Sequence, residues 1–130
     1  MAAFKQALFP ETGLPPVGPY SPAILSGNML FLSGQIALDE ITGNLLCGTI
    51  EEETHQVMRN MGKLLQTQGL GYEHLVKVSI FLTDLGQFGN VNKVYASYFK
   101  DGVYPARETV QVVRLPKDAH VEMSGIAVKH

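Results

Sequence analysis

The feature that most constrains this chain is a shortage of helices relative to its apolar strands. Only two stretches, near residues 49–68 and 84–101, have the periodicity of amphipathic helices. Two helices can cover one face of a sheet, yet residues 29–32 and 110–113 are apolar on both sides of a strand. An apolar sheet face needs a cover. We therefore expect an oligomer whose sheets pack together, the alternative being that loops from residues 1–22 fold across that face.

Periodicity and capping residues place the individual elements. Thr49 and Glu52 have capping-box spacing at the start of the first helix, and Gly69 follows its end. Asp84 is the expected N-cap of the second helix, which should end near residues 101–102. Strands are predicted at residues 23–25, 29–32, 75–83, 108–115 and 120–128, with turns at 26–28 and 115–118. The order is strands, helix, strand, helix, strands, an α+β arrangement.

Size and charge exclude several classes of protein. The 130 residues form a single domain (1–130) that can fold without disulfide or metal, and Cys47 is the only cysteine. Ten basic and twelve acidic side chains give a net charge of −2, which argues against nucleic-acid binding. No apolar run approaches the roughly 20 residues that span a bilayer, and the start lacks the apolar stretch of a secretory signal. We expect a soluble, reducing compartment.

The common catalytic motifs are missing. The four histidines show no metal-ligand spacing, and there is neither a phosphate-binding glycine loop nor a nucleophile elbow. We therefore expect no metal site.

Three polar residues in apolar surroundings are better candidates. Asn92 points along the apolar stripe of the second helix, where it either lines a site or ties down a neighbouring loop. Glu122, between Val121 and Met123, lies either at an open edge or in a cleft. Arg107 enters a strand directly after a Pro-containing loop, and its plainer interpretation is a surface arginine.

Two glycine-containing segments add to these candidates. Residues 18–22 form a rigid turn that presents the hydroxyl of Tyr20, although the turn can equally be a structural lid. Gly34, in Ser33-Gly34-Gln35, interrupts an apolar strand and predicts a bulge or a close backbone approach.

Taken together, these segments resemble the RidA (YjgF) family over about residues 18–128. The resemblance rests on ordered motifs: Gly18-Pro19-Tyr20-Ser21-Pro22-Ala23, Ser33-Gly34-Gln35, Val91-Asn92-Lys93-Val94-Tyr95, Pro105-Ala106-Arg107, Leu115-Pro116-Lys117 and Val121-Glu122. It implies a chorismate-mutase-like fold, a mixed sheet with two helices on one face. It also implies a homotrimer whose sheets face inward, with a cleft at each subunit interface.

The resemblance further implies a cofactor-independent 2-iminobutanoate/2-iminopropanoate deaminase. Such enzymes hydrolyse reactive imines and enamines, for example 2-aminoacrylate, to a 2-keto acid and ammonia. Arg107 would hold the substrate carboxylate through two parallel hydrogen bonds, and Glu122 would position the water and move protons. The residues that match the lining of the family's cleft are Tyr20, Ser33, Gly34, Asn92 and Thr109.

Two other functions stay open. A non-catalytic trimer could use the same arginine to sense a small carboxylate such as a 2-keto acid. A translation inhibitor or ribonuclease, labels that the family has also carried, fits the net charge of −2 poorly. Glu108 departs from the small polar residue usual in the family, but strand alternation should turn it away from Arg107. Cytoplasm is the expected compartment, or mitochondria if the source is eukaryotic, and the physiological imine cannot be read from the sequence.

Overall fold

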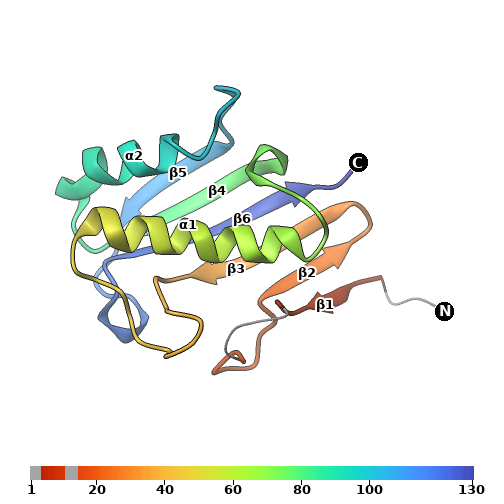
Figure 1. The fold of residues 1–130 in the computed structure, drawn as a ribbon, viewed down its shortest axis with the longest axis horizontal. Coiled ribbons are helices and arrows are strands. Elements are labelled where there is room, and N and C mark those ends of the chain that lie inside the picture. Colours follow the sequence, from red (N-terminus) through yellow and green to blue (C-terminus); the bar gives the residue numbers. More distant parts are fainter. Residues whose placement is uncertain (1–3, 11–14) are drawn as a thin grey trace.

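The computed structural model describes residues 4–10 and 15–130, which fold as one mixed sheet with two α-helices on one side (Figure 1). The strand order is β1-β2-β3-β6-β4-β5, with β4 and β5 parallel and the other neighbours antiparallel. This confirms the predicted α+β architecture. The elements are β1 Gln6–Leu8, β2 Ala23–Ser26, β3 Met29–Gln35, α1 Ile50–Gln66, the 3₁₀ turn η1 Tyr72–His74, β4 Leu75–Leu82, η2 Leu85–Gln87, α2 Phe88–Ala96, β5 Ala106–Gln111, η3 Pro116–Asp118 and β6 Val121–Val128.

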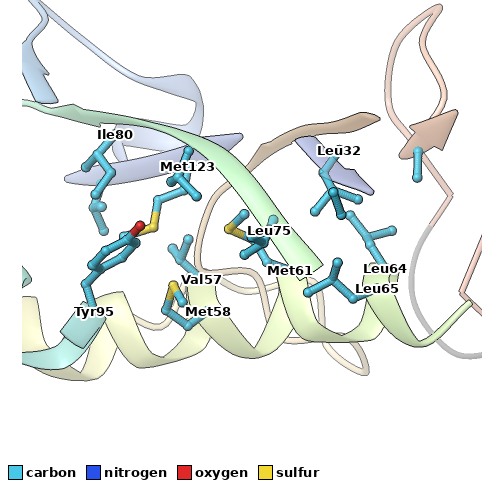
Figure 2. Close-up of a cluster of buried hydrophobic side chains, with 14 of the residues drawn as sticks. Leu32, Val57, Met58, Met61, Leu64, Leu65, Leu75, Ile80, Tyr95 and Met123 are labelled. Atoms are coloured by element: carbon cyan, nitrogen blue, oxygen red, sulfur yellow. The ribbon is translucent and has the colours of Figure 1, made fainter. Parts of the chain in front are cut away.

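The helix α1 forms where its caps and apolar stripe predict it. The hydroxyl of Thr49 accepts a hydrogen bond from the Glu52 N–H at 3.1 Å, which satisfies one donor of the first turn. The stripe then packs against the sheet, where it meets Leu32, Ile80 and Met123 (Figure 2). Fully burying each such side chain contributes about 1.5–3 kcal/mol. The buried stripe consists of Val57, Met58, Met61, Leu64 and Leu65.

A buried carboxylate ties α1 to the start of β6. Glu53 lies in the acidic first turn of α1, beside Glu51 and Glu52, yet it is only 1% exposed. Its Oε2 accepts hydrogen bonds from the backbone N–H of His120 at 2.7 Å and of Val121 at 3.2 Å. Its Oε1 lies 2.8 Å from Nδ1 of His120. Glu53 therefore fixes the backbone that leads directly into Glu122.

We predict that Glu53→Ala lowers the free energy of unfolding by about 2–4 kcal/mol, because it leaves two backbone donors without a partner. Urea denaturation measures this loss. Glu51→Ala is the matched control: Glu51 is in the same helical turn but exposed, so its removal should change stability by no more than about 0.5 kcal/mol. Equal effects of the two substitutions would contradict the anchoring role of Glu53.

Several element boundaries differ from the sequence prediction, and β3 continues to Gln35, beyond the predicted end at residue 32. The strand predicted at 108–115 corresponds to β5, which spans Ala106–Gln111. It ends there because its partner β4 ends at Leu82, whose carbonyl accepts a hydrogen bond from Val112 N–H. Asp84 caps the 3₁₀ turn η2, not an α-helix, by accepting from Gly86 N–H at 2.8 Å. Two glycines near this point disfavour an α-helix, and α2 starts only at Phe88 and stops at Ala96. The short edge strand β1 was not predicted.

The sheet leaves its second face open, as the sequence predicts. On that face Met29 and Phe31 of β3 remain 37% and 39% exposed, and Val110 of β5 is 41% exposed. The described part of the first 22 residues does not cover them, since β1 extends the sheet edge by pairing with β2. No helix in the described ranges is long and apolar enough to cross a membrane.

Candidate active site

Four of the predicted site residues line one hollow of about 520 Å³. They are Tyr20 from the turn at 18–22, Ser33 and Gly34 from the end of β3, and Glu122 from β6. The turn and the strand are connected directly: Ser33 N–H donates to the Pro22 carbonyl at 2.9 Å, and its hydroxyl donates to the Ser21 carbonyl at 2.6 Å. Ser33 therefore holds the segment that carries Tyr20.

A side chain approaches the backbone closely at Gly34. The register of β3 against β6 shifts between Leu32 and Gln35, which is the irregularity predicted at this glycine. A Cβ atom placed on Gly34 would lie only 2.7 Å from Oε2 of Glu122. The absence of a side chain thus lets the carboxylate lie directly against the β3 backbone.

The Glu122 carboxyl group is half-buried on the open face of the sheet. Burial removes water from the charged form and raises the pKa of Glu122 above its usual value. A carboxyl with a raised pKa exchanges protons more readily near neutral pH, which is what a general base or acid requires.

The raised pKa of Glu122 has a consequence for stability. Because the fold favours the protonated form, ionisation costs stability as pH rises above the unfolded pKa of about 4.3. We predict that the free energy of unfolding of Glu122→Gln rises relative to that of wild type as the pH increases from 3 to 8, because only wild type must ionise Glu122. Glu108→Gln should show the opposite trend, since Lys77 and Ser79 hold the pKa of Glu108 low. Denaturant unfolding at several pH values tests both, and trends of the same sign would contradict the assignment.

The second hollow, of about 350 Å³, lies beside Arg107. Asn92 and Tyr95 of α2 line it together with Tyr104, Pro105 and Arg107. The Arg107 guanidinium carbon lies 4.9 Å from the ring centre of Tyr95 and 5.5 Å from that of Phe88. These cation–π contacts hold the guanidinium in place, so Arg107 is not a freely mobile surface arginine.

Three polar atoms near this arginine have no hydrogen-bond partner within the described part of the chain. They are Oδ1 of Asn92, the hydroxyl of Tyr95 and Oγ1 of Thr109. Burial raises the pKa of Tyr95 to about 12, so its hydroxyl stays neutral. Unpaired buried groups cost about 1–3 kcal/mol each. They are typical of places where a ligand, a water or a side-chain movement completes the bonding.

Arg107 and Glu122 lie on opposite faces of the sheet. Arg107 pairs with Val78, on the face that the helices cover, whereas Glu122 pairs with Phe81, on the open face. Across the sheet, Arg107 and Glu122 are two strand spacings apart, about 10 Å. Along the strands they are three residues apart, which adds about 10 Å in the perpendicular direction. One subunit therefore does not bring Arg107 and Glu122 to the same small molecule.

Glu108 lies away from Arg107, as strand alternation predicts. Its carboxylate pairs with Lys77 at 2.7 Å and accepts a short hydrogen bond from Ser79 on the open face. It does not compete for the guanidinium. In residues 4–10 and 15–130, no cluster of three or more His, Cys, Asp or Glu side chains is placed to bind a metal ion.

The sequence gives no role at the site to Phe88 and Tyr95. Their rings contact Arg107 because α2 packs beside β5, a pairing that helical periodicity cannot reveal. The available signal was Asn92, which lies between them on the same helical face.

Comparison with known proteins identifies the family. The family model described as endoribonuclease L-PSP matches residues 11–129. The chain belongs to this family, the RidA/YjgF family.

A RutC family protein of Pyrococcus horikoshii is 42% identical over 125 residues, which cover 96% of this chain and 98% of the relative. The human 2-iminobutanoate/2-iminopropanoate deaminase is 38% identical over 113 residues, 87% of this chain and 82% of the relative. The structure of E. coli TdcF with bound serine superimposes with a TM-score of 0.90 at 31% identity, covering 96% of this chain and 99% of TdcF. Proteins of this family thus carry different names, among them the imine deaminase of human and the endoribonuclease of the family model.

Proposed function

We propose that this chain hydrolyses 2-imino acids and their enamine tautomers, such as 2-aminoacrylate, to 2-keto acids and ammonia in the cytoplasm, or in mitochondria if the source is eukaryotic. Two side chains carry the proposal. The Arg107 guanidinium is held by contacts with two aromatic rings, and the half-buried carboxyl group of Glu122 has a raised pKa. The name of the human relative, an imine deaminase at 38% identity, supports the same chemistry.

The reaction needs few groups because a protonated imine carbon is already electrophilic. Arg107 holds the substrate carboxylate with two parallel hydrogen bonds, which a lysine cannot provide. Glu122 takes a proton from water as the oxygen bonds to the imine carbon, and then returns it to the nitrogen. The C–N bond of this carbinolamine then breaks while its hydroxyl proton passes to the departing ammonia, so that ammonium leaves and the 2-keto acid remains. Tyr20, Ser33 and Gly34 line the hollow beside Glu122, and Asn92 lines the hollow beside Arg107, while Thr109 lies two residues after Arg107 on β5.

The separation of Arg107 from Glu122 supports a shared site between copies. A homotrimer whose open sheet faces point inward would cover Met29, Phe31 and Val110. In the same assembly, the Arg107 hollow of one subunit would meet the Glu122 hollow of the next. One arrangement thus accounts for both the exposed apolar face and the divided site.

The assembly depends on the apolar open face. We predict that Phe31→Arg, which puts a charge at the centre of that face, shifts the mass in solution from trimer towards monomer. Ile41→Arg is the matched control, because Ile41 is 84% exposed in a loop outside the sheet. Analytical ultracentrifugation measures both. A monomeric wild type, or a Phe31→Arg trimer of normal stability, would refute the proposed interface.

Mixing two inactive variants tests the shared site and the reaction together. We predict that Arg107→Ala and Glu122→Gln each lose most pyruvate formation when a dehydratase converts serine to 2-aminoacrylate. Unfolding the two variants together and refolding them at equal amounts should restore roughly a quarter of wild-type activity, because one interface in four then combines an intact arginine with an intact glutamate. Sites built within single subunits would give no recovery.

A carboxylate-binding trimer without catalysis is the second candidate, since the related TdcF is described with bound serine. It needs Arg107 but not Glu122. Wild-type protein that binds 2-keto acids yet adds nothing to the spontaneous hydrolysis of 2-aminoacrylate would establish this alternative.

A further inference from the structure

The turn between β5 and β6 has an unusual backbone. Lys117 and Asp118 have φ angles of 56° and 57°, and apart from glycines no other residue in the described part of the chain has a positive φ. A side chain in this left-handed region is strained, because its Cβ atom comes too close to a backbone carbonyl oxygen. Strain of this kind persists only where surrounding contacts impose it, and it is concentrated at functional sites.

Contacts on both sides of the turn impose this conformation. Leu115 and Ala119 are buried, and the Asp118 N–H donates to the Leu115 carbonyl at 3.2 Å. The Asp118 carboxylate accepts a hydrogen bond from Nε of Arg114 at 2.7 Å. These contacts fix the backbone without involving the ammonium group of Lys117. The strained backbone therefore sets the direction in which the Lys117 side chain leaves the turn.

Lys117 lies beside the Glu122 hollow. It is exposed and lines this hollow together with Pro116 and Glu122. The other cation of the lining, Lys63, forms a salt bridge with Glu40. No hydrogen bond or ion pair within residues 4–10 and 15–130 engages the Lys117 ammonium group. Among the described residues that line the hollow, Lys117 thus offers the uncommitted positive charge.

The hollow otherwise repels an anion. Asp39 lines it as well as Glu122. Backbone hydrogen bonds from Thr42 and Ile41 lower the pKa of Asp39, so its carboxylate is ionised at neutral pH. A 2-imino acid carries a carboxylate of its own, and the whole chain has a net charge of −2. A cation at the rim offsets this repulsion and raises the rate at which an anion arrives.

We propose that Lys117 captures the anionic imino acid at the rim of the Glu122 hollow, and that the strained turn holds it there for this purpose. The inference rests on the proposed deaminase function. Because 2-aminoacrylate and its imine also react with water unaided, an enzyme gains by capturing them early. Lys117 acts when the substrate arrives, whereas Arg107 of a neighbouring copy holds the carboxylate during the reaction.

Electrostatics sets the size and the salt dependence of the expected effect. Two opposite unit charges about 4 Å apart in water favour association about fivefold. The screening length is about 30 Å at an ionic strength of 10 mM and about 3 Å at 1 M. The contribution of Lys117 should therefore be several-fold at low salt and nearly absent at high salt.

The experiment measures kcat/KM for the imine that an amino-acid oxidase makes in place from alanine, in competition with semicarbazide, which traps the free imine. Lys117→Asn should lower kcat/KM about three- to fivefold at 10 mM ionic strength and by less than about 1.5-fold at 1 M. Asparagine tolerates a left-handed backbone, so the turn should keep its shape. Lys117→Arg keeps the charge and should retain the wild-type kcat/KM at both ionic strengths.

Lys100→Asn is the matched control. Lys100 is exposed and lines neither hollow, so the loss of its charge should leave kcat/KM unchanged. A loss in Lys100→Asn equal to that in Lys117→Asn would show a general effect of net charge and would overturn the proposal.

Lys117→Gly separates the strain from the charge. Glycine adopts a positive φ without steric cost, which outweighs its greater freedom in the unfolded chain. This variant should unfold at a temperature roughly 2–4 °C above that of wild type and yet lose as much kcat/KM as Lys117→Asn. A lysine with a merely structural role would lose stability and activity together, and that result would overturn the proposal. So would unchanged kcat/KM in Lys117→Gly, a loss that persists at 1 M, or no recovery in Lys117→Arg.

The failures of the two proposals are distinguishable. If the wild type is active and Lys117→Asn matches it at 10 mM ionic strength, the deaminase function stands and the capture role of Lys117 is wrong. If the wild type does not accelerate imine hydrolysis, the deaminase function is wrong. The dissociation constant for 2-oxobutanoate, measured by calorimetry, then tests Lys117 through the same ratios between variants, and an absence of binding by the wild type would refute both.

Discussion

Arg107 and Glu122 lie on opposite faces of one sheet because side chains alternate along a β-strand and the register of β4 with its two neighbours is fixed. A slip of one residue in either pairing would move one of the two groups to the other face. The alternation therefore separates two groups of polar residues, Arg107 with the hollow beside α2 and Glu122 with the hollow beside the turn at 18–22. The chemistry proposed for this chain depends on how copies combine these groups.

The open face has two properties that usually conflict. It carries exposed apolar side chains such as Phe31, which favour association, and it also carries Glu122, whose charge opposes burial. An interface that covers this face while leaving a narrow cleft at Glu122 satisfies both. The cost of burial is then useful, since the raised pKa of Glu122 is what suits it to proton transfer.

Both groups of residues are held by contacts outside the reacting side chains. Two aromatic rings of α2 fix Arg107, and the buried carboxylate of Glu53 fixes the entry to β6 just before Glu122. Ser33 holds the segment that presents Tyr20. Each contact joins elements that are distant in sequence, so the precision of the sites comes from packing more than from local chain geometry.

The sequence by itself determined the element types, the two helical stripes, the apolar second face and the candidate residues. Spacing and capping are local properties, and the family motifs name the side chains directly. Helix boundaries near Asp84 and the end of β5 were misplaced because glycine content and the length of a partner strand decided them. Only the tertiary structure decided that Glu53 is an anchor, that the rings of Phe88 and Tyr95 hold Arg107, and that Arg107 and Glu122 are separated by the sheet. These facts depend on strand register and on helix placement over the sheet, which are set by contacts between residues far apart in the chain.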